Sequence, residues 1–294
     1  MRLIPAGHQA PESWANGVLH PGKWRGLRVL GWGMALVLLL FGGVTLTGYL
    51  MRPAHTAPWL FVHVEIAVAV GLALYVAAVR WGERRPVTEL APGSAVSELA
   101  IGLLFGFALF SAVMLILVAA GGYTLSAPHV APAWTSLTLS FGSGVMEELV
   151  FRGILFRLLW GALGLRWALG VSAAVFGLMH LLNPDHSLMG ALDLIIEAGL
   201  LLAALYVVTG RLFASIGCHF AWNFTQGYVF GVQVSGTPFG ASVLHAQAVP
   251  GASIWLTGGD FGPEASAPAV LAGLLTAIAL LAWHLRHGKR RLPS

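Results

Sequence analysis

Long apolar runs separated by short polar connections dominate the chain. Eight such runs can be recognised, at residues 27–51, 59–79, 97–120, 134–159, 167–182, 190–208, 211–234 and 267–285. Most of them reach the length of about 17–25 residues that a helix needs to cross a bilayer, and the fifth is the shortest. The pattern predicts an all-α protein: a polytopic membrane helix bundle with about eight transmembrane helices.

The basic residues predict the orientation of this bundle. With a cytosolic N-terminus, 14 of the 16 Lys and Arg residues fall in the connections and tails on the cytosolic side. Only Arg52 falls on the other side, and Arg152 lies within a predicted helix. Since short cytosolic loops carry an excess of Lys and Arg, we expect an even number of crossings with both termini cytosolic.

These assignments divide the chain into five parts. In order, we expect a cytosolic N-terminal lead-in, N-terminal transmembrane helices, a core of transmembrane helices that carries the motifs described below, an extracytosolic loop, and a last transmembrane helix with a basic cytosolic tail. Their respective residues are 1–26, 27–133, 134–235, 236–266 and 267–294. The loop is rich in Gly, Pro and Ala and is long enough for a lid or a re-entrant segment.

Composition excludes the usual soluble classes. Of the 294 residues, 57% are hydrophobic and 10% are charged, whereas soluble domains carry about 25% charged residues. The net charge of +4 is read as a topology signal, so no nucleic-acid partner is expected. Arg predominates over Lys, an association that suggests a bacterial plasma (inner) membrane. The single cysteine, Cys218, excludes an intrachain disulfide.

The fourth apolar segment carries three ionisable residues, Glu147, Glu148 and Arg152. An ionisable side chain at mid-membrane costs at least about 2.5–3.5 kcal/mol, so each needs a partner or a chemical role. Glu148 and Arg152 are four residues apart, on one helix face and in the favourable order for an ion pair. Glu147 points about 100° away and has no basic partner in its own helix, which makes it a candidate for chemistry.

The fifth and seventh segments supply further polar groups. Phe176 and His180 lie four residues apart in the fifth, and His219 and Asn223 do so in the seventh. A rise of about 1.5 Å per residue places His180 about 21 Å, His219 about 12 Å and Glu147 about 20 Å from the cytosolic side. Three helices thus bring Glu, His, His and Asn side chains to overlapping depths.

These three motifs, in this order on successive membrane helices, resemble the CPBP family of intramembrane proteases. The family includes CAAX prenyl endopeptidases and bacterial bacteriocin-processing homologues, and the resemblance covers roughly residues 134–235. It implies a glutamate-dependent endopeptidase in which Glu147 and His180 activate a water, while His219 and Asn223 stabilise the oxyanion. It also implies supporting roles, with Glu148 and Arg152 as an architectural pair and Phe176 shaping the pocket.

A zinc mechanism is the alternative, because Glu147, His180 and His219 could supply three ligands and leave a position for water. We expect no cofactor, since Asn223 stands where a further His or acidic ligand would favour a metal. The substrate is expected to be a membrane-associated or lipid-modified protein or peptide. Its identity, its prenylation and the oligomeric state of the enzyme are left open.

Two other classes of function compete with a protease. Membrane acids at several depths, including Glu65, Asp193 and Glu197, are also what a proton-coupled transporter needs. A non-catalytic membrane scaffold is the second rival, although all four catalytic-type positions hold competent residues. Asp193 and Glu197 are expected to line a water-filled entrance or pair with an arginine, with control of substrate entry or proton sharing as the alternative.

Overall fold

The structure is a computed structural model that describes residues 16–51, 57–126 and 132–287. The expected N-terminal lead-in, as far as residue 15, and the end of the basic tail, from residue 288, lie outside the described residues. Within the described part the chain is overwhelmingly helical, which confirms the predicted polytopic helical bundle.

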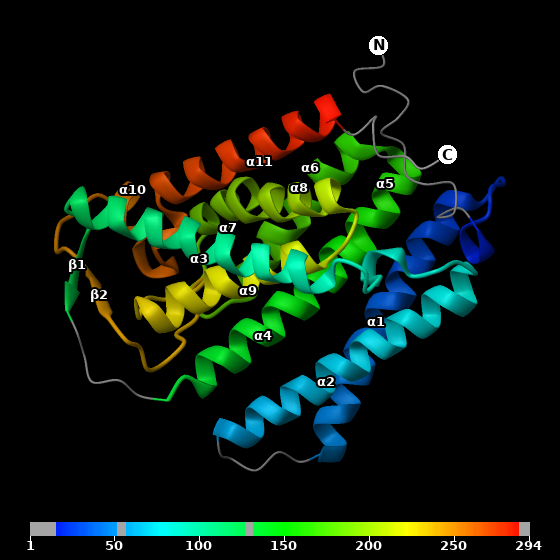
Figure 1. The fold of residues 1–294 in the computed structure, drawn as a ribbon, viewed down its shortest axis with the longest axis horizontal. Helices are drawn as coiled ribbons and strands as arrows, with labels where there is room; N and C mark the ends of the chain where they lie inside the picture. Colours follow the sequence, from blue (N-terminus) through cyan, green and yellow to red (C-terminus); the bar gives the residue numbers. More distant parts are fainter. Residues whose placement is uncertain (1–15, 52–56, 127–131, 288–294) are drawn as a thin grey trace.

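The helices follow one another closely along the chain (Figure 1). They are α1 (Arg25–Met51), α2 (Ala57–Ala78), α3 (Ala95–Ala119), α4 (Trp134–Glu148), α5 (Arg157–Leu163), α6 (Leu165–Met179), α7 (Leu188–Leu194), α8 (Leu200–Thr209), α9 (Phe213–Phe224), α10 (Ile254–Thr257) and α11 (Ala267–His287). Two short strands, β1 (Tyr123–Ser126) and β2 (His245–Ala248), pair in antiparallel fashion at one end of the bundle. The predicted 236–266 loop therefore contains β2, α10 and short 3₁₀ turns.

Six helical stretches in the described part are long and apolar enough to cross a membrane. They are 25–51, 58–83, 95–119, 165–182, 188–209 and 267–287. The other two predicted crossings are helical too, but α4 and α5 flank a charged π-helical segment and α9 is 12 residues long. The count of eight crossings and the cytosolic termini stay predictions.

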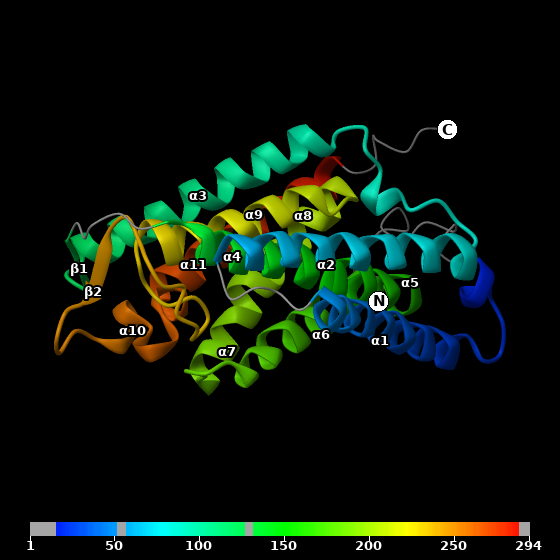
Figure 2. The same ribbon diagram turned by 90° about the horizontal axis from the view of Figure 1, so that it is seen from below.

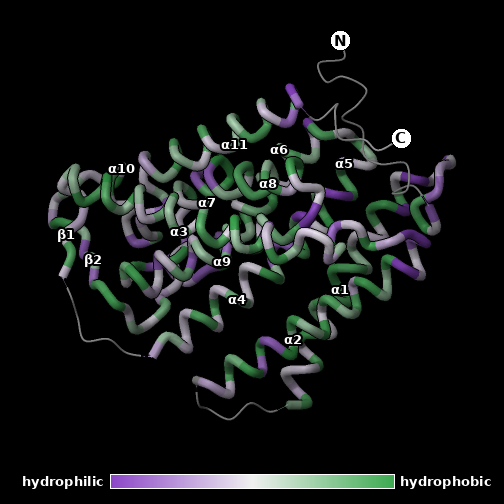
Figure 3. Tube along the Cα trace, in the orientation of Figure 1, coloured by the Kyte–Doolittle hydropathy of each residue, from purple (hydrophilic) through white to green (hydrophobic). Residues whose placement is uncertain are grey.

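The helices α1 and α2 form a pair beside the rest of the bundle, and α2 packs against α4 (Figures 1 and 2). Hydrophobic residues run along most of the helices, whereas hydrophilic residues gather where α1 begins (Figure 3). Many large apolar side chains on the outer faces are exposed, such as Leu38, Leu104 and Leu275. This outward apolar surface is what a lipid-facing bundle presents.

Glycines let α3 and α9 approach closely. A Cβ at Gly102 would lie 2.3 Å from the Ala214 carbonyl oxygen, and one at Gly106 would lie 2.3 Å from that of Cys218. Neither position accepts a larger residue without moving backbone, as in the small-xxx-small packing of membrane helices. Because Cys218 directly precedes His219, this contact fixes the part of α9 that carries the candidate site.

A compact ionic cluster is buried at the predicted cytosolic end. Arg85 contacts both Glu83 and Glu89 at 2.7 Å, and Arg157 contacts Glu83 at 2.7 Å, while Tyr75 donates to Glu89. The four charged side chains are almost completely inaccessible to solvent. Burial acts to raise the pKa of Glu89, but the Arg85 and Arg157 guanidinium groups and the Tyr75 hydrogen bond together hold that pKa below its ordinary value. The cluster ties the end of α2 to the start of α5.

Candidate active site

Three π-helical segments surround the polar interior of the bundle. Leu149–Phe156 follows Glu148 directly, Ile195–Gly199 joins α7 to α8, and Thr225–Val229 extends α9. A π-helical turn changes the face on which the following side chains lie, and such turns are frequent at functional sites. Glu197 lies within the second segment, and Glu147 and Asn223 each lie two residues before one of the others.

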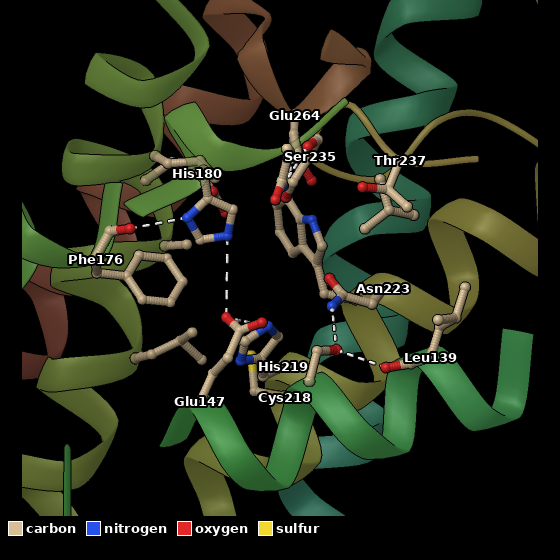
Figure 4. Close-up of a pocket in the computed structure, with 18 of the residues that line it drawn as sticks. Leu139, Glu147, Phe176, His180, Cys218, His219, Asn223, Ser235, Thr237 and Glu264 are labelled. Atoms are coloured by element: carbon tan, nitrogen blue, oxygen red, sulfur yellow. Dashed lines mark hydrogen bonds and ion pairs between the residues drawn. The ribbon is translucent and has the colours of Figure 1, made fainter. Parts of the chain in front are cut away.

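Glu147, His180 and His219 meet at one cavity, as Figure 4 shows for the labelled side chains. The Glu147 Oε2 atom lies 3.9 Å from His180 Nε2 and 3.8 Å from His219 Nε2. These separations are too long for direct hydrogen bonds, and a water between the groups is the natural bridge. Among the described residues Oε2 has no hydrogen-bond partner, and the cavity of about 180 Å³ has room for water.

His180 is held in one orientation by its own helix. Its Nδ1 atom lies 2.8 Å from the Phe176 carbonyl oxygen, which can only accept, so Nδ1 carries a proton. Nε2 then faces Glu147 across the cavity. The Phe176 ring centroid lies 4.8 Å from that of the His180 ring, and the Arg152 Cζ atom lies over the Phe176 ring at 4.7 Å from its centroid. Phe176 thus shapes the cavity wall behind the histidine.

His219 is oriented by Glu148. Its Nδ1 atom lies 3.0 Å from Glu148 Oε1, and the Arg152 Nη1 atom donates to the same oxygen at 2.8 Å. The sequence predicted the pairing of Glu148 with Arg152 but missed the second partner. The other Arg152 nitrogen, Nη2, donates to the carbonyl oxygens of Ala198 and Gly199 at 3.2 Å. Glu148 therefore connects the architectural pair directly to a candidate catalytic histidine.

Asn223 also reaches the cavity, where it contacts Ser143, a residue outside the three sequence motifs. Its Nδ2 atom donates to Ser143 Oγ at 3.0 Å, and Ser143 in turn donates to the Leu139 carbonyl oxygen at 2.9 Å. Ser143 lies four residues before Glu147 and so on the same helix face, a spacing that could have pointed to it. The four residues assigned to catalysis by resemblance, Glu147, His180, His219 and Asn223, thus line one cavity.

Residues from outside the three motifs form another wall of this cavity. Ser235, Thr237, Phe239 and Glu264 line it, and Ser235 Oγ donates to Glu264 Oε1 at 2.6 Å. Burial raises the pKa of the Glu264 carboxyl, although the Ser235 hydrogen bond acts in the opposite direction. No pattern in the sequence marked these positions, because they come from irregular segments far from the helical motifs.

Residues 129–225 match a family described as Rce1-like, type II CAAX prenyl endopeptidase. This part of the chain is therefore similar to the CPBP family. This confirms the resemblance seen in the sequence, and the matched residues include all four candidate catalytic positions. No curated protein and no solved structure matches the chain significantly. The match, together with the apolar helices, supports an integral membrane protease that acts on a protein or peptide.

Glu147, His180 and His219 are the ligand set of the alternative zinc mechanism. Tetrahedral ligands at about 2.0–2.1 Å from zinc lie about 3.4 Å apart, whereas Glu147 Oε2 lies 3.8 Å and 3.9 Å from the two histidine nitrogens. In the part of the chain that the structure describes, no group of three His, Cys, Asp or Glu residues is spaced to hold a metal ion. In this arrangement Glu147, His180 and His219 do not fit a zinc ion.

Proposed function

We propose that this protein is a glutamate-dependent intramembrane endopeptidase of the CPBP type. The observation that carries the proposal is the convergence of Glu147, His180 and His219, from three separate helices, on one water-sized gap. Asn223 lines the same cavity. A carboxylate, two imidazoles and an amide in this arrangement are the groups that hydrolysis of a peptide bond by an activated water requires.

In the first step, Glu147 accepts a proton from a water that His180 helps to hold, and the water oxygen bonds to the carbonyl carbon of the substrate. Glu147 suits the role of base because its Oε2 has no hydrogen bond among the described residues and faces the cavity. Its side chain is 31% exposed, which leaves room for the water. The product of this step is a tetrahedral intermediate with a negatively charged oxygen.

The second step needs donors for that oxygen. Asn223 Nδ2 supplies one, and His219 supplies the other through Nε2 when its ring is protonated. The Glu148 carboxylate at Nδ1 stabilises the imidazolium form of His219, as a buried carboxylate does in other hydrolases. The carbon–nitrogen bond then breaks, and the proton held by Glu147 passes to the departing amine.

The substrate in this proposal is a membrane-associated or lipid-modified protein or peptide. The matched family is described as prenyl endopeptidases, so a prenylated peptide is one class to include in any assay. A bacterial plasma membrane is the proposed location, on the basis of the excess of Arg over Lys. Residues from α4, α9 and the 234–239 segment line the cavity, so the proposed cleavage takes place inside the bundle.

The test is a cleavage assay with the purified protein in liposomes. A complex peptide library, including prenylated members, is added, and newly formed termini are sequenced by mass spectrometry. We expect Glu147→Gln to abolish cleavage while the protein stays folded, because the amide cannot accept the proton from water. The matched control is Glu65→Gln, which neutralises an exposed glutamate of α2 outside the cavity and should leave cleavage intact.

Cleavage by Glu147→Gln at the wild-type rate would contradict the assignment of the base. Loss of proton-driven solute uptake in Glu65→Gln, with no peptide cleaved by the wild type, would favour the transporter instead.

A further inference from the structure

Two carboxylates of the cavity have no role in the proposed hydrolysis. Glu197 lies in the π-helical segment between α7 and α8, and Glu264 lies in the turn before α11. Their exposed fractions are 1% and 2%, so both are buried, and both line the cavity that contains Glu147. Figure 4 shows Glu264 beyond His180, on the side away from Glu147. The cavity thus has three glutamates along its walls.

No Lys or Arg side chain in the described part of the chain balances these carboxylates from within the cavity, where His180 is the basic group that acts on Glu264. Neither Lys nor Arg occurs among its lining residues, and no ion pair joins Glu197 or Glu264 to Lys or Arg in residues 16–51, 57–126 and 132–287. The nearby Arg152 is already engaged by Glu148 and by two backbone carbonyls. Glu197 Oε2 is buried with no hydrogen-bond partner within the described residues. An uncompensated buried carboxylate is costly, which calls for a proton or for a cation.

The shape of the surroundings favours a cation on an aliphatic stem. Leu194, Ala198, Leu201 and Leu202 line the cavity near Glu197, so its carboxylate stands at an otherwise apolar wall. Lysine and arginine bury their methylene stems along apolar surface and need a polar partner only for the head group. A pocket with apolar walls and a few placed polar groups is also the usual form of a specificity site.

The wall that carries Glu264 is held in a defined geometry. Ser235, which donates to Glu264, has a positive φ of 48°, an unusual conformation for a residue other than glycine. Asn183 Nδ2 donates to the Ser235 carbonyl oxygen at 2.6 Å, and the Gly236 backbone N–H donates to the Phe261 carbonyl oxygen at 2.8 Å. This turn is fixed from two sides, which is what preorganised recognition of a ligand requires.

We propose that the cavity receives a basic side chain of the substrate, Lys or Arg, close to the cleaved bond, with Glu197 and Glu264 as its carboxylate partners. The proposal rests on the endopeptidase function proposed above and gives that function a substrate class.

Quenched fluorescent peptides with apolar flanks test this preference. Each set varies one position at a time near the centre among Lys, Arg and norleucine, which has a similar stem but no charge. Since an unmatched buried charge partner costs about 2–5 kcal/mol, we expect the wild type to cleave the best basic peptide with a kcat/KM at least about 30-fold above that of its norleucine counterpart. Equal rates for the two would overturn the proposal while leaving the endopeptidase function standing.

Variants assign the preference to the two glutamates. Glu197→Gln and Glu264→Gln should each reduce the ratio of basic to norleucine cleavage by about 10-fold or more, because the amide keeps the shape but not the charge. The matched control is Asp193→Asn, which removes an acid one turn from Glu197 that does not line the cavity and should keep the ratio. A ratio that is unchanged in both Gln variants would exclude these residues as the cation site.

A binding measurement separates this proposal from the proposed function. Glu147→Gln is expected to leave peptides uncleaved, so its affinity for the same fluorescent peptides reports recognition alone. Tighter binding of the basic peptides, with no cleavage by the wild type, would keep the cation site and refute the endopeptidase. Cleavage by the wild type, with no difference in affinity or rate between basic and norleucine peptides, would refute the cation site and keep the endopeptidase.

Discussion

Replacing Glu148 by glutamine removes the carboxylate charge that contacts both Arg152 and His219. The Oε1 atom receives Arg152 Nη1 at 2.8 Å and His219 Nδ1 at 3.0 Å, and the Glu148 side chain is fully buried. A hydrogen bond to a charged group contributes about 1.5–3 kcal/mol, and loss of one partner of a buried ion pair costs about 3–5 kcal/mol. We therefore expect Glu148→Gln to lower the free energy of unfolding by at least about 3 kcal/mol.

The same variant should also impair turnover, because His219 loses the carboxylate that orients its ring. We expect kcat to fall by at least about 10-fold in the folded fraction. Unfolding is followed by titration with a denaturing detergent, and turnover by cleavage of the peptides found in the library assay. The matched control is Glu98→Gln, which breaks a partly exposed pair with Arg211 at 3.4 Å and should cost about 1 kcal/mol or less.

Two results would refute this reasoning. A Glu148→Gln protein that unfolds within about 1 kcal/mol of the wild type would show that the buried pair does not stabilise the bundle. Normal turnover at reduced stability would show that Glu148 serves Arg152 alone, as the sequence had suggested.

Three further predictions concern donors, metal and pH. Asn223→Ala should lower kcat by about 10²–10³ with little change in KM, since a donor to the oxyanion acts in the transition state; a pure KM effect would place Asn223 in substrate binding instead. Cleavage should survive exhaustive chelation, with no stoichiometric zinc by elemental analysis; activity that is lost with zinc and restored by it would contradict this. The pKa of Glu264 in the folded protein lies above its ordinary value of 4.5. As the pH rises above 4.5, this carboxyl therefore lowers the free energy of unfolding, in total by about 1.4 kcal/mol for each unit by which the folded pKa exceeds the unfolded one. The melting temperature of Glu264→Gln should then exceed that of the wild type by a margin that grows from acidic to neutral pH. A margin that does not change with pH would contradict this prediction.

The sequence was sufficient for the class of fold and for the residues that meet at the centre. Apolar length predicts helices that cross a membrane, and polar residues spaced four apart predict which side chains share a face. This spacing reflects local helix geometry, which is why the pairing of Glu148 with Arg152 was predicted and is present in the structure. Membrane burial of Glu147, His180 and His219 then singled these residues out.

The arrangement between helices was beyond a count along the chain. The estimated depths of His180 and His219 differed by about 9 Å, yet both nitrogens lie within 4 Å of one Glu147 oxygen. A count of residues ignores helix tilt and the true starting depth of each helix. The π-helical segments also change the facing of later side chains, and Glu264 comes from a turn without periodicity. These contacts depend on tertiary packing.

In the predicted topology, two arginines of the buried ionic cluster act at two successive stages, first during membrane insertion and then in the folded protein. While the helices enter the membrane, Arg85 and Arg157 count toward retention of their connections in the cytosol, and acidic neighbours contribute little to that choice. After assembly the same guanidinium groups are paired with Glu83 and Glu89 and withdrawn from solvent. Part of the predicted orientation signal is thus carried by charges that the folded protein no longer exposes. A surface charge map of the folded molecule would understate the signal that set its topology.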